Sequence, residues 1–216
     1  MAERSGTFRV YRVTESVPQI NLQATETPAL YSVYQTGYGD RQDAVDALET
    51  GDMIKTTLEG DPTADDEPWR LGRFERVGGV QMGFAVGVAP PDVAQDLWTD
   101  GQTEPATTVL TEDGSAVGAC GVQPRDPLPN GAFVPNVLTG LLPLEPQFAS
   151  VPGVGEPAVE VLFVDPDPPG ARTYSMPYGV VLLFTTAGTN LAERFRETYG
   201  CPRGVDTRPA FDPYSA

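Results

Sequence analysis

The sequence contains no histidine and a single lysine, Lys55, among its 216 residues. Without an imidazole, a Ser-His-Asp or Cys-His pair, a histidine general base and a histidine-ligated zinc or iron are all excluded. Cys120 and Cys201 are the only cysteines and each stands alone, which excludes a CxxC metal or redox site. We expect two buried free thiols, and a disulfide is the alternative.

Long apolar stretches are also missing. The first ten residues, "MAERSGTFRV", carry charges and lack the apolar segment of an export signal. No window of the sequence approaches the roughly 18 apolar residues that indicate a membrane-spanning helix. We therefore expect a cytoplasmic protein with no membrane partner.

Acidic residues dominate the charge, with 30 Asp and Glu against 14 Lys and Arg and a net charge of −16. The carboxylates are spread along the chain and form no acidic tail. This distribution favours a halophilic cytoplasm, where molar salt screens charges beyond about 3 Å and an acidic surface keeps proteins soluble. A cationic partner is the alternative. In a halophile, a negative net charge does not exclude a nucleic-acid partner.

The N-terminal part alternates in the manner of short strands and contains one helical pattern. Asp40 is a suitable N-cap for the helix, and Gly51 ends it. Strands are predicted at 7–13, 19–25, 29–36, 52–60 and 69–77. Three strands, a helix and two strands is the order of an OB-fold barrel. We expect an α+β protein that begins with an OB-like five-stranded β-barrel domain at 1–79. Another half-open barrel, or a sheet with one helix, is the alternative.

Residues 80–216 predict a second, smaller α/β half. Its clearest element is a C-terminal helix, with Asn190 and Glu193 as a capping-box pair and Gly200 past its end. The glycines of "RVGGVQMGFAVG" lack the strand-loop-helix context of a nucleotide site. The remaining predictions are a helix in 90–98, a hairpin over 106–122, a short helix within 133–146, and central strands at 158–164 and 178–186.

Two acidic loops are candidate cation sites. Asp165 and Asp167 in "DPDPPG" have a spacing found in calcium sites, but a third ligand and the closing glutamate of an EF-hand are missing. Residues 61–67 form a similar acidic loop. We interpret both as solvated loops. The sequence thus predicts no metal, no cofactor and no catalytic residue, and indicates a non-enzymatic protein.

Basic and aromatic residues share faces on two predicted strands. Arg70, Phe74 and Arg76 alternate along the fifth strand, and Arg9 and Tyr11 share a face of the first. Such a row can stack a base and hold phosphates. We therefore predict that these five residues bind RNA, free or on the ribosome. In the alternative interpretation, the arginines form cross-strand salt bridges.

Two observations oppose the RNA hypothesis. Barrels of the OB type bind with their second and third strands, whereas these arginines lie on the first and fifth. Tyr31, Val33 and Tyr34, on the third strand, have no adjacent positive charge.

The C-terminal tail "RPAFDPYSA", 208–216, presents Phe211 and Tyr214 without regular structure. Such a tail either wraps over its own domain or docks onto a partner. The rival hypothesis is accordingly a protein-protein adaptor or a structural subunit of a larger assembly, such as a virion, that docks through Phe211 and Tyr214.

Several short elements together resemble an uncharacterised family of haloarchaeal proteins, a domain of unknown function. The resemblance rests on "GTFRV" at 6–10, "GYGD" at 37–40, the segment 48–58, "GLLPLEP" at 140–146 and "RETY" at 196–199. The middle departs from the family's pattern, with "EPATT" at 104–108. The resemblance implies a haloarchaeal source and a full-length single unit, and it brings no known activity.

Overall fold

The computed structural model describes residues 2–12, 19–64 and 67–210. Within them the chain forms two compact units. The first comprises the described residues up to Gly79 together with 138–143, and the second comprises the other described residues. Each unit contains one five-stranded sheet, which confirms the α+β class.

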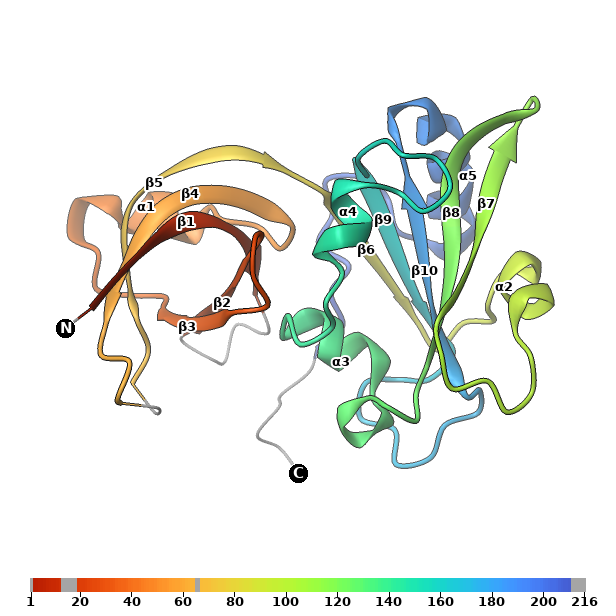
Figure 1. Ribbon diagram of the computed structural model, residues 1–216, viewed down its shortest axis with the longest axis horizontal. Coiled ribbons are helices and arrows are strands. Elements are labelled where there is room, and N and C mark those ends of the chain that lie inside the picture. Colours follow the sequence, from red (N-terminus) through yellow and green to blue (C-terminus); the bar gives the residue numbers. More distant parts are fainter. Residues whose placement is uncertain (1, 13–18, 65–66, 211–216) are drawn as a thin grey trace. The chain divides into compact units, whose positions relative to one another are not determined.

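The first unit follows the predicted order of three strands, a helix and two strands (Figure 1). The strand order in its antiparallel sheet is β3-β2-β1-β4-β5. The elements are β1 (Ala2–Tyr11), β2 (Gln19–Ala24), β3 (Leu30–Tyr34), the 3-10 helix η1 (Gly39–Arg41), α1 (Gln42–Asp46), β4 (Asp52–Gly60) and β5 (Arg70–Gly79).

The two edges of this sheet meet at one point. An isolated parallel bridge joins Val33 of β3 to Trp69, the residue before β5. The Tyr34 amide donates to the Trp69 carbonyl at 3.0 Å, and the Trp69 amide donates to the Ser32 carbonyl at 2.7 Å. No ladder extends from this bridge within the described part of the chain, because β3 is short and β5 begins only after Trp69. The sheet is therefore not closed into a barrel, which corrects the expectation from the sequence.

One face of the first sheet forms the core of its unit. Side chains of a strand alternate between the two faces, so apolar residues two apart share a side. Phe8 and Val10 of β1 lie on the inner face, and Val45 and Leu48, in and after α1, pack against the same cluster. The strands β2 to β5 add Ile20, Leu22, Val33, Ile54, Leu58 and Leu71.

The second unit is built on a sheet of order β6-β9-β10-β8-β7, which is also open. β6 is parallel to β9, and the other neighbours are antiparallel. Its strands are β6 (Gln81–Val86), β7 (Ala106–Glu112), β8 (Ser115–Pro124), β9 (Glu160–Asp165) and β10 (Tyr178–Phe184). β9 and β10 are buried along their whole length, so the prediction of central strands is confirmed.

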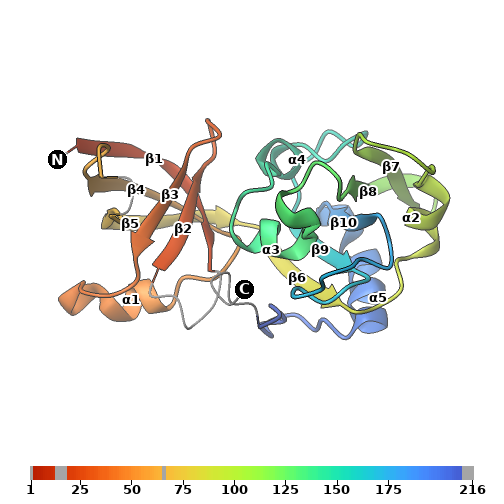
Figure 2. The same cartoon turned by 90° about the horizontal axis from the view of Figure 1, so that it is seen from below.

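Helices cover both faces of this second sheet. In Figures 1 and 2, α5 lies against one face, and α3 and α4 lie against the other. Cys120 and Cys201 are buried as free thiols, as expected. The helices are α2 (Asp92–Leu97), η2 (Pro129–Gly131), α3 (Phe133–Leu138), α4 (Glu145–Ala149), η3 (Thr186–Gly188) and α5 (Thr189–Tyr199).

The described residues contain no helix that could span a membrane. Every helix found there is too short or too polar to cross a bilayer.

Candidate functional site

The predicted arginine-aromatic row on β5 is interrupted by a β-bulge. Leu58 pairs with Leu71 and Thr56 pairs with Phe74, so β5 advances three residues where β4 advances two. An extra residue of this kind reverses which side chains face the core. Leu71 is buried and Phe74 packs against the same core, whereas Arg70, the neighbour of Leu71, points outward. Arg70 and Phe74 therefore lie on opposite faces, and the single row is not formed.

Arg9 and Tyr11 share a face as predicted, but that face is covered. Arg9 is 4% exposed and Tyr11 is fully buried. The Arg9 guanidinium donates to the Gly51 carbonyl at 3.0 Å. Gly140 packs so closely that a Cβ there would lie 3.1 Å from the Tyr11 ring. The two side chains therefore belong to the interior of the first unit and are not offered to a ligand at its surface.

The contacts of Arg76 are those of the alternative interpretation, in which the arginines form cross-strand salt bridges. Its side chain is 44% exposed, and its Nε lies 3.3 Å from Oδ2 of Asp52 on the neighbouring strand. It also donates to the Ala47 carbonyl. Arg76 thus forms a cross-strand salt bridge. The tail residues Phe211 and Tyr214 lie outside the described residues.

Arg70 is placed over a tyrosine from the other edge of the sheet. Its guanidinium lies 5.0 Å from the ring centroid of Tyr34. Tyr34 ends β3 and Arg70 begins β5, so the bridge between Val33 and Trp69 brings the pair together. Among the residues that the structure describes, no carboxylate forms an ion pair with the exposed Arg70. Tyr34 therefore gains from β5 the positive charge that its sequence neighbours do not provide.

A second arginine-tyrosine pair is hydrogen-bonded to the strands that carry the first. Arg41 lies 5.4 Å from the centroid of the Tyr38 ring and donates to the carbonyl of Gly72 at 2.6 Å. The Tyr38 hydroxyl donates to the Tyr34 carbonyl at 2.6 Å and accepts from the Leu71 amide at 3.1 Å. These contacts tie the bulge of β5 to the end of β3. We call Tyr34, Tyr38, Arg41 and Arg70 the arginine-tyrosine cluster.

Burial also sets the ionisation of the cluster. It raises the pKa of Tyr38, against the opposing effects of the hydrogen bond with Leu71 and of the charges on Arg70 and Arg41. The Tyr38 hydroxyl is therefore a neutral hydrogen-bonding group at neutral pH, and the two arginines supply the charge of the cluster.

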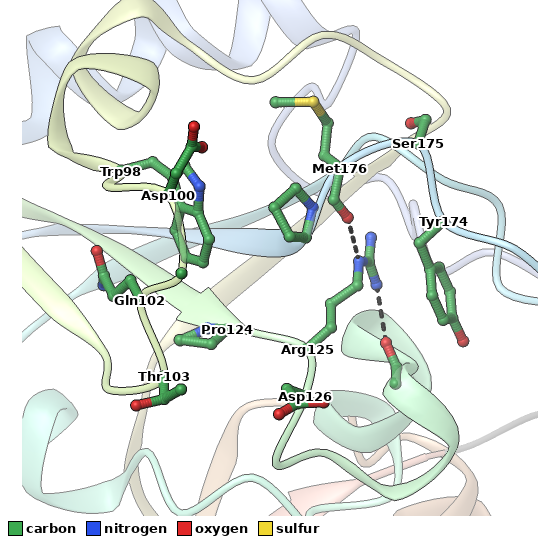
Figure 3. A pocket seen from close by; sticks show the side chains of 13 residues that line it. Trp98, Asp100, Gln102, Thr103, Pro124, Arg125, Asp126, Tyr174, Ser175 and Met176 are labelled. Carbon is green, nitrogen blue, oxygen red and sulfur yellow. Dashed lines mark hydrogen bonds between the residues drawn. The ribbon is translucent and has the colours of Figure 1, made fainter.

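The second unit contains a pocket with a volume of about 720 Å³. In Figure 3, Trp98 and Asp100 lie on one side of it, and Arg125 and Tyr174 lie on the other. The indole of Trp98 stacks on the ring of Tyr178, with centroids 4.7 Å apart. The lining also includes Gly101, Gln102, Thr103, Pro124, Asp126, Gly131, Ser175, Met176 and Pro177. Sequence reasoning missed this site, because its residues come from four separate segments.

Arg125 forms the buried wall of the pocket. Its Nη2 donates to Asp165 at 2.5 Å and to Asp167 at 3.1 Å. Its Nε donates to the Met176 carbonyl at 2.9 Å, and its Nη1 donates to the Gly131 carbonyl at 3.1 Å. The guanidinium also stacks on Tyr174, 4.2 Å from the ring centroid. This one side chain thus connects two of the segments that line the pocket, that of Gly131 and that of Tyr174 and Met176, and the dashed lines of Figure 3 show its hydrogen bonds from Nε and Nη1.

The loop of Asp165 and Asp167 is not the solvated acidic loop that the sequence predicted. Both carboxylates are buried, with 2% and 5% of the residue exposed, because together they neutralise Arg125. Burial alone would raise the pKa of Asp167, but hydrogen bonds from Ser175 and Met176 and the charge of Arg125 lower it. Within the described ranges, no group of three His, Cys, Asp or Glu side chains could hold a metal ion.

These features define an α+β protein with two open sheets, an arginine-tyrosine cluster in which Arg70 is exposed, and a mixed aromatic and acidic pocket. The chain belongs to a family of unknown function, DUF6663, whose pattern matches residues 1–204. Comparisons with curated proteins and with solved structures give no match.

Proposed function

We propose that the protein is a non-enzymatic RNA-binding protein of a halophilic archaeon, acting free or on the ribosome. RNA binds to the arginine-tyrosine cluster of the first unit. The observation that carries the proposal is the exposed guanidinium of Arg70, which lies 5.0 Å from the Tyr34 ring and is not ion-paired with any described carboxylate.

The arrangement of the strands supports this location. OB-folds are partly open five-stranded barrels that bind oligonucleotides with their second and third strands and with the loop between the fourth and fifth. In the first unit, Tyr34 ends the third strand and Arg70 follows the loop between β4 and β5. We therefore propose an OB-like domain at 1–79, followed by a second domain at 80–216, with the cluster at the binding face of the first.

The chemistry of the pair suits a single-stranded nucleic acid. A planar guanidinium stacks on bases and makes bidentate contacts with phosphates, which a lysine does not. The acidic loop at 61–67 lies next to Arg70 in the sequence and repels phosphates. In molar salt the ionic part of RNA affinity is weak in any case, so stacking supplies most of the affinity.

The test is binding of short single-stranded RNA in molar KCl, measured by fluorescence anisotropy. Arg70→Ala should weaken binding about tenfold, because stacking contributes about 1–3 kcal/mol per base. Arg76→Ala is the matched control, since it removes the same charge from the same strand but from a residue held by Asp52. Arg70→Lys should behave like Arg70→Ala. Equal losses in Arg70→Ala and Arg76→Ala would refute the cluster as the binding site.

A pull-down in molar KCl separates this function from that of a protein-protein adaptor. Partners that disappear after ribonuclease treatment support RNA binding. Partners that survive the nuclease and disappear when residues 208–216 are deleted support the adaptor, because that deletion removes Phe211 and Tyr214.

A further inference from the structure

The charges around the pocket of the second unit disfavour a phosphate-bearing ligand. Asp100 and Asp126 line the pocket and are exposed, and among the described lining residues Arg125 alone is basic. The positive charge of Arg125 is already matched by Asp165 and Asp167, which accept from its Nη2. The field inside the pocket is consequently negative, and it attracts cations and repels anions.

The remaining lining offers an aromatic surface. One face of the Trp98 indole packs on the buried Tyr178, which fixes the ring in place. The Met176 side chain and the rings of Pro124 and Pro177 add apolar surface. In Figure 3, Trp98 and Asp100 are both drawn on the side of the pocket away from the Arg125 guanidinium.

We propose that this pocket binds an organic cation, namely an ammonium group that carries alkyl substituents. Trp98 attracts the cation through its π-face, which is the strongest such surface among the aromatic side chains. Asp100 and Asp126 supply the countercharge, and Met176 and the prolines contact the alkyl groups. A free alkylamine and an alkylated lysine of a peptide present the same chemistry.

Arg125 has a positioning role in this site. It is hydrogen-bonded to the carbonyls of Gly131 and Met176, both of which line the pocket. Its buried carboxylate partners keep its charge from repelling the ligand.

The experiment titrates choline into the full-length protein at constant chloride concentration, replacing potassium, and follows binding by calorimetry. We expect saturable binding, and at least about tenfold weaker binding in the double variant Asp100→Asn with Asp126→Asn. Asp113→Asn is the matched control: it removes a carboxylate from the β7–β8 turn, where φ is +50°, a conformation that asparagine tolerates. It should bind choline like the wild type.

Tryptophan fluorescence provides an independent measurement. The chain has two tryptophans, so Trp69→Phe leaves Trp98 as the single emitter. Its emission should change saturably with choline and not with potassium. A peptide containing trimethyllysine distinguishes the sources: tighter binding of the peptide assigns a protein side chain, and tighter binding of choline assigns a small free cation.

The proposal is overturned if neither choline nor the peptide binds saturably in calorimetry. It is also overturned if the Asp100→Asn, Asp126→Asn variant binds like the wild type, which would reduce the two carboxylates to solvated surface charge. These outcomes are independent of RNA binding, because the arginine-tyrosine cluster lies in the other unit.

Discussion

Both units contain arginines that lie over tyrosine rings, and the Arg70–Tyr34 pair of the first unit differs from the Arg125–Tyr174 pair of the second in burial and in ionic partners. Arg70 lies 5.0 Å from the Tyr34 ring at the surface of the first unit. Arg125 lies 4.2 Å from the Tyr174 ring, is 4% exposed and binds two buried carboxylates. The same contact therefore leaves one guanidinium available to a ligand and makes the other a structural connector. Burial and the neighbouring carboxylates, rather than the stacking itself, decide which role an arginine has.

The largest effect is expected from removing the buried guanidinium. Arg125→Met leaves Asp165 and Asp167 buried without their cation, and should lower the free energy of unfolding by about 3–5 kcal/mol. Arg70→Met, the matched change at the surface, should stay within about 0.5 kcal/mol of the wild type. Urea denaturation measures both. Similar losses in the two variants would mean that the buried and the exposed pair do not differ in their structural role.

A smaller loss of stability is expected from a substitution in the β5 bulge, which places Arg70 and Phe74 on opposite faces. A Cβ added at Gly72 would lie 2.6 Å from the Thr57 carbonyl oxygen, so Gly72→Ala should destabilise the protein by about 1–3 kcal/mol. Gly170→Ala is the control, because nothing lies within 4 Å of its added Cβ. Thermal unfolding of the two variants tests the difference. A Gly72→Ala variant as stable as the control would show that the bulge relaxes freely.

The smallest effect is expected on the loss of stability at acidic pH. The pKa of Asp167 is lower in the folded state, so its contribution to stability is present above its unfolded pKa of about 3.9. That contribution disappears as the pH falls through the folded value. Asp167→Asn should therefore show a shallower loss of stability below about pH 4 than the wild type. Urea midpoints measured between neutral and acidic pH compare the slopes, and parallel curves would contradict this assignment.

Patterns that depend on local sequence were predicted well. Alternation and apolar runs predicted the strands of the first unit and both central strands of the second, because a period of two reflects the faces of a sheet directly. The end of α5 was also correct, since Gly200 adopts a left-handed conformation with φ +65°. The predicted start of α5 was wrong, because the helix begins at Thr189 and no side chain caps it. The capping box of Asn190 and Glu193 is therefore not formed.

Features that depend on pairing between distant segments of the chain are not predicted from the sequence. β6 is not predicted because Gly83 interrupts its strand pattern and its partner β9 is remote in the sequence. The bulge at Gly72 shifts the register, and no pattern in β5 alone predicts it. Asp165 and Asp167 were interpreted as solvated because Arg125 lies 40 residues before Asp165. In an acidic chain, only the fold distinguishes these two carboxylates from the many that remain at the surface.

The bridge between Val33 and Trp69 also bears on aggregation. An edge strand presents unpaired amides and carbonyls that can recruit a strand from another molecule. In the first unit, the hydrogen bonds of Tyr34 and Trp69 engage such groups where the two edges meet. Neither edge therefore offers an uninterrupted row of open backbone groups at that end. A single bridge of two hydrogen bonds thus provides part of the protection against self-association that a closed barrel provides in full.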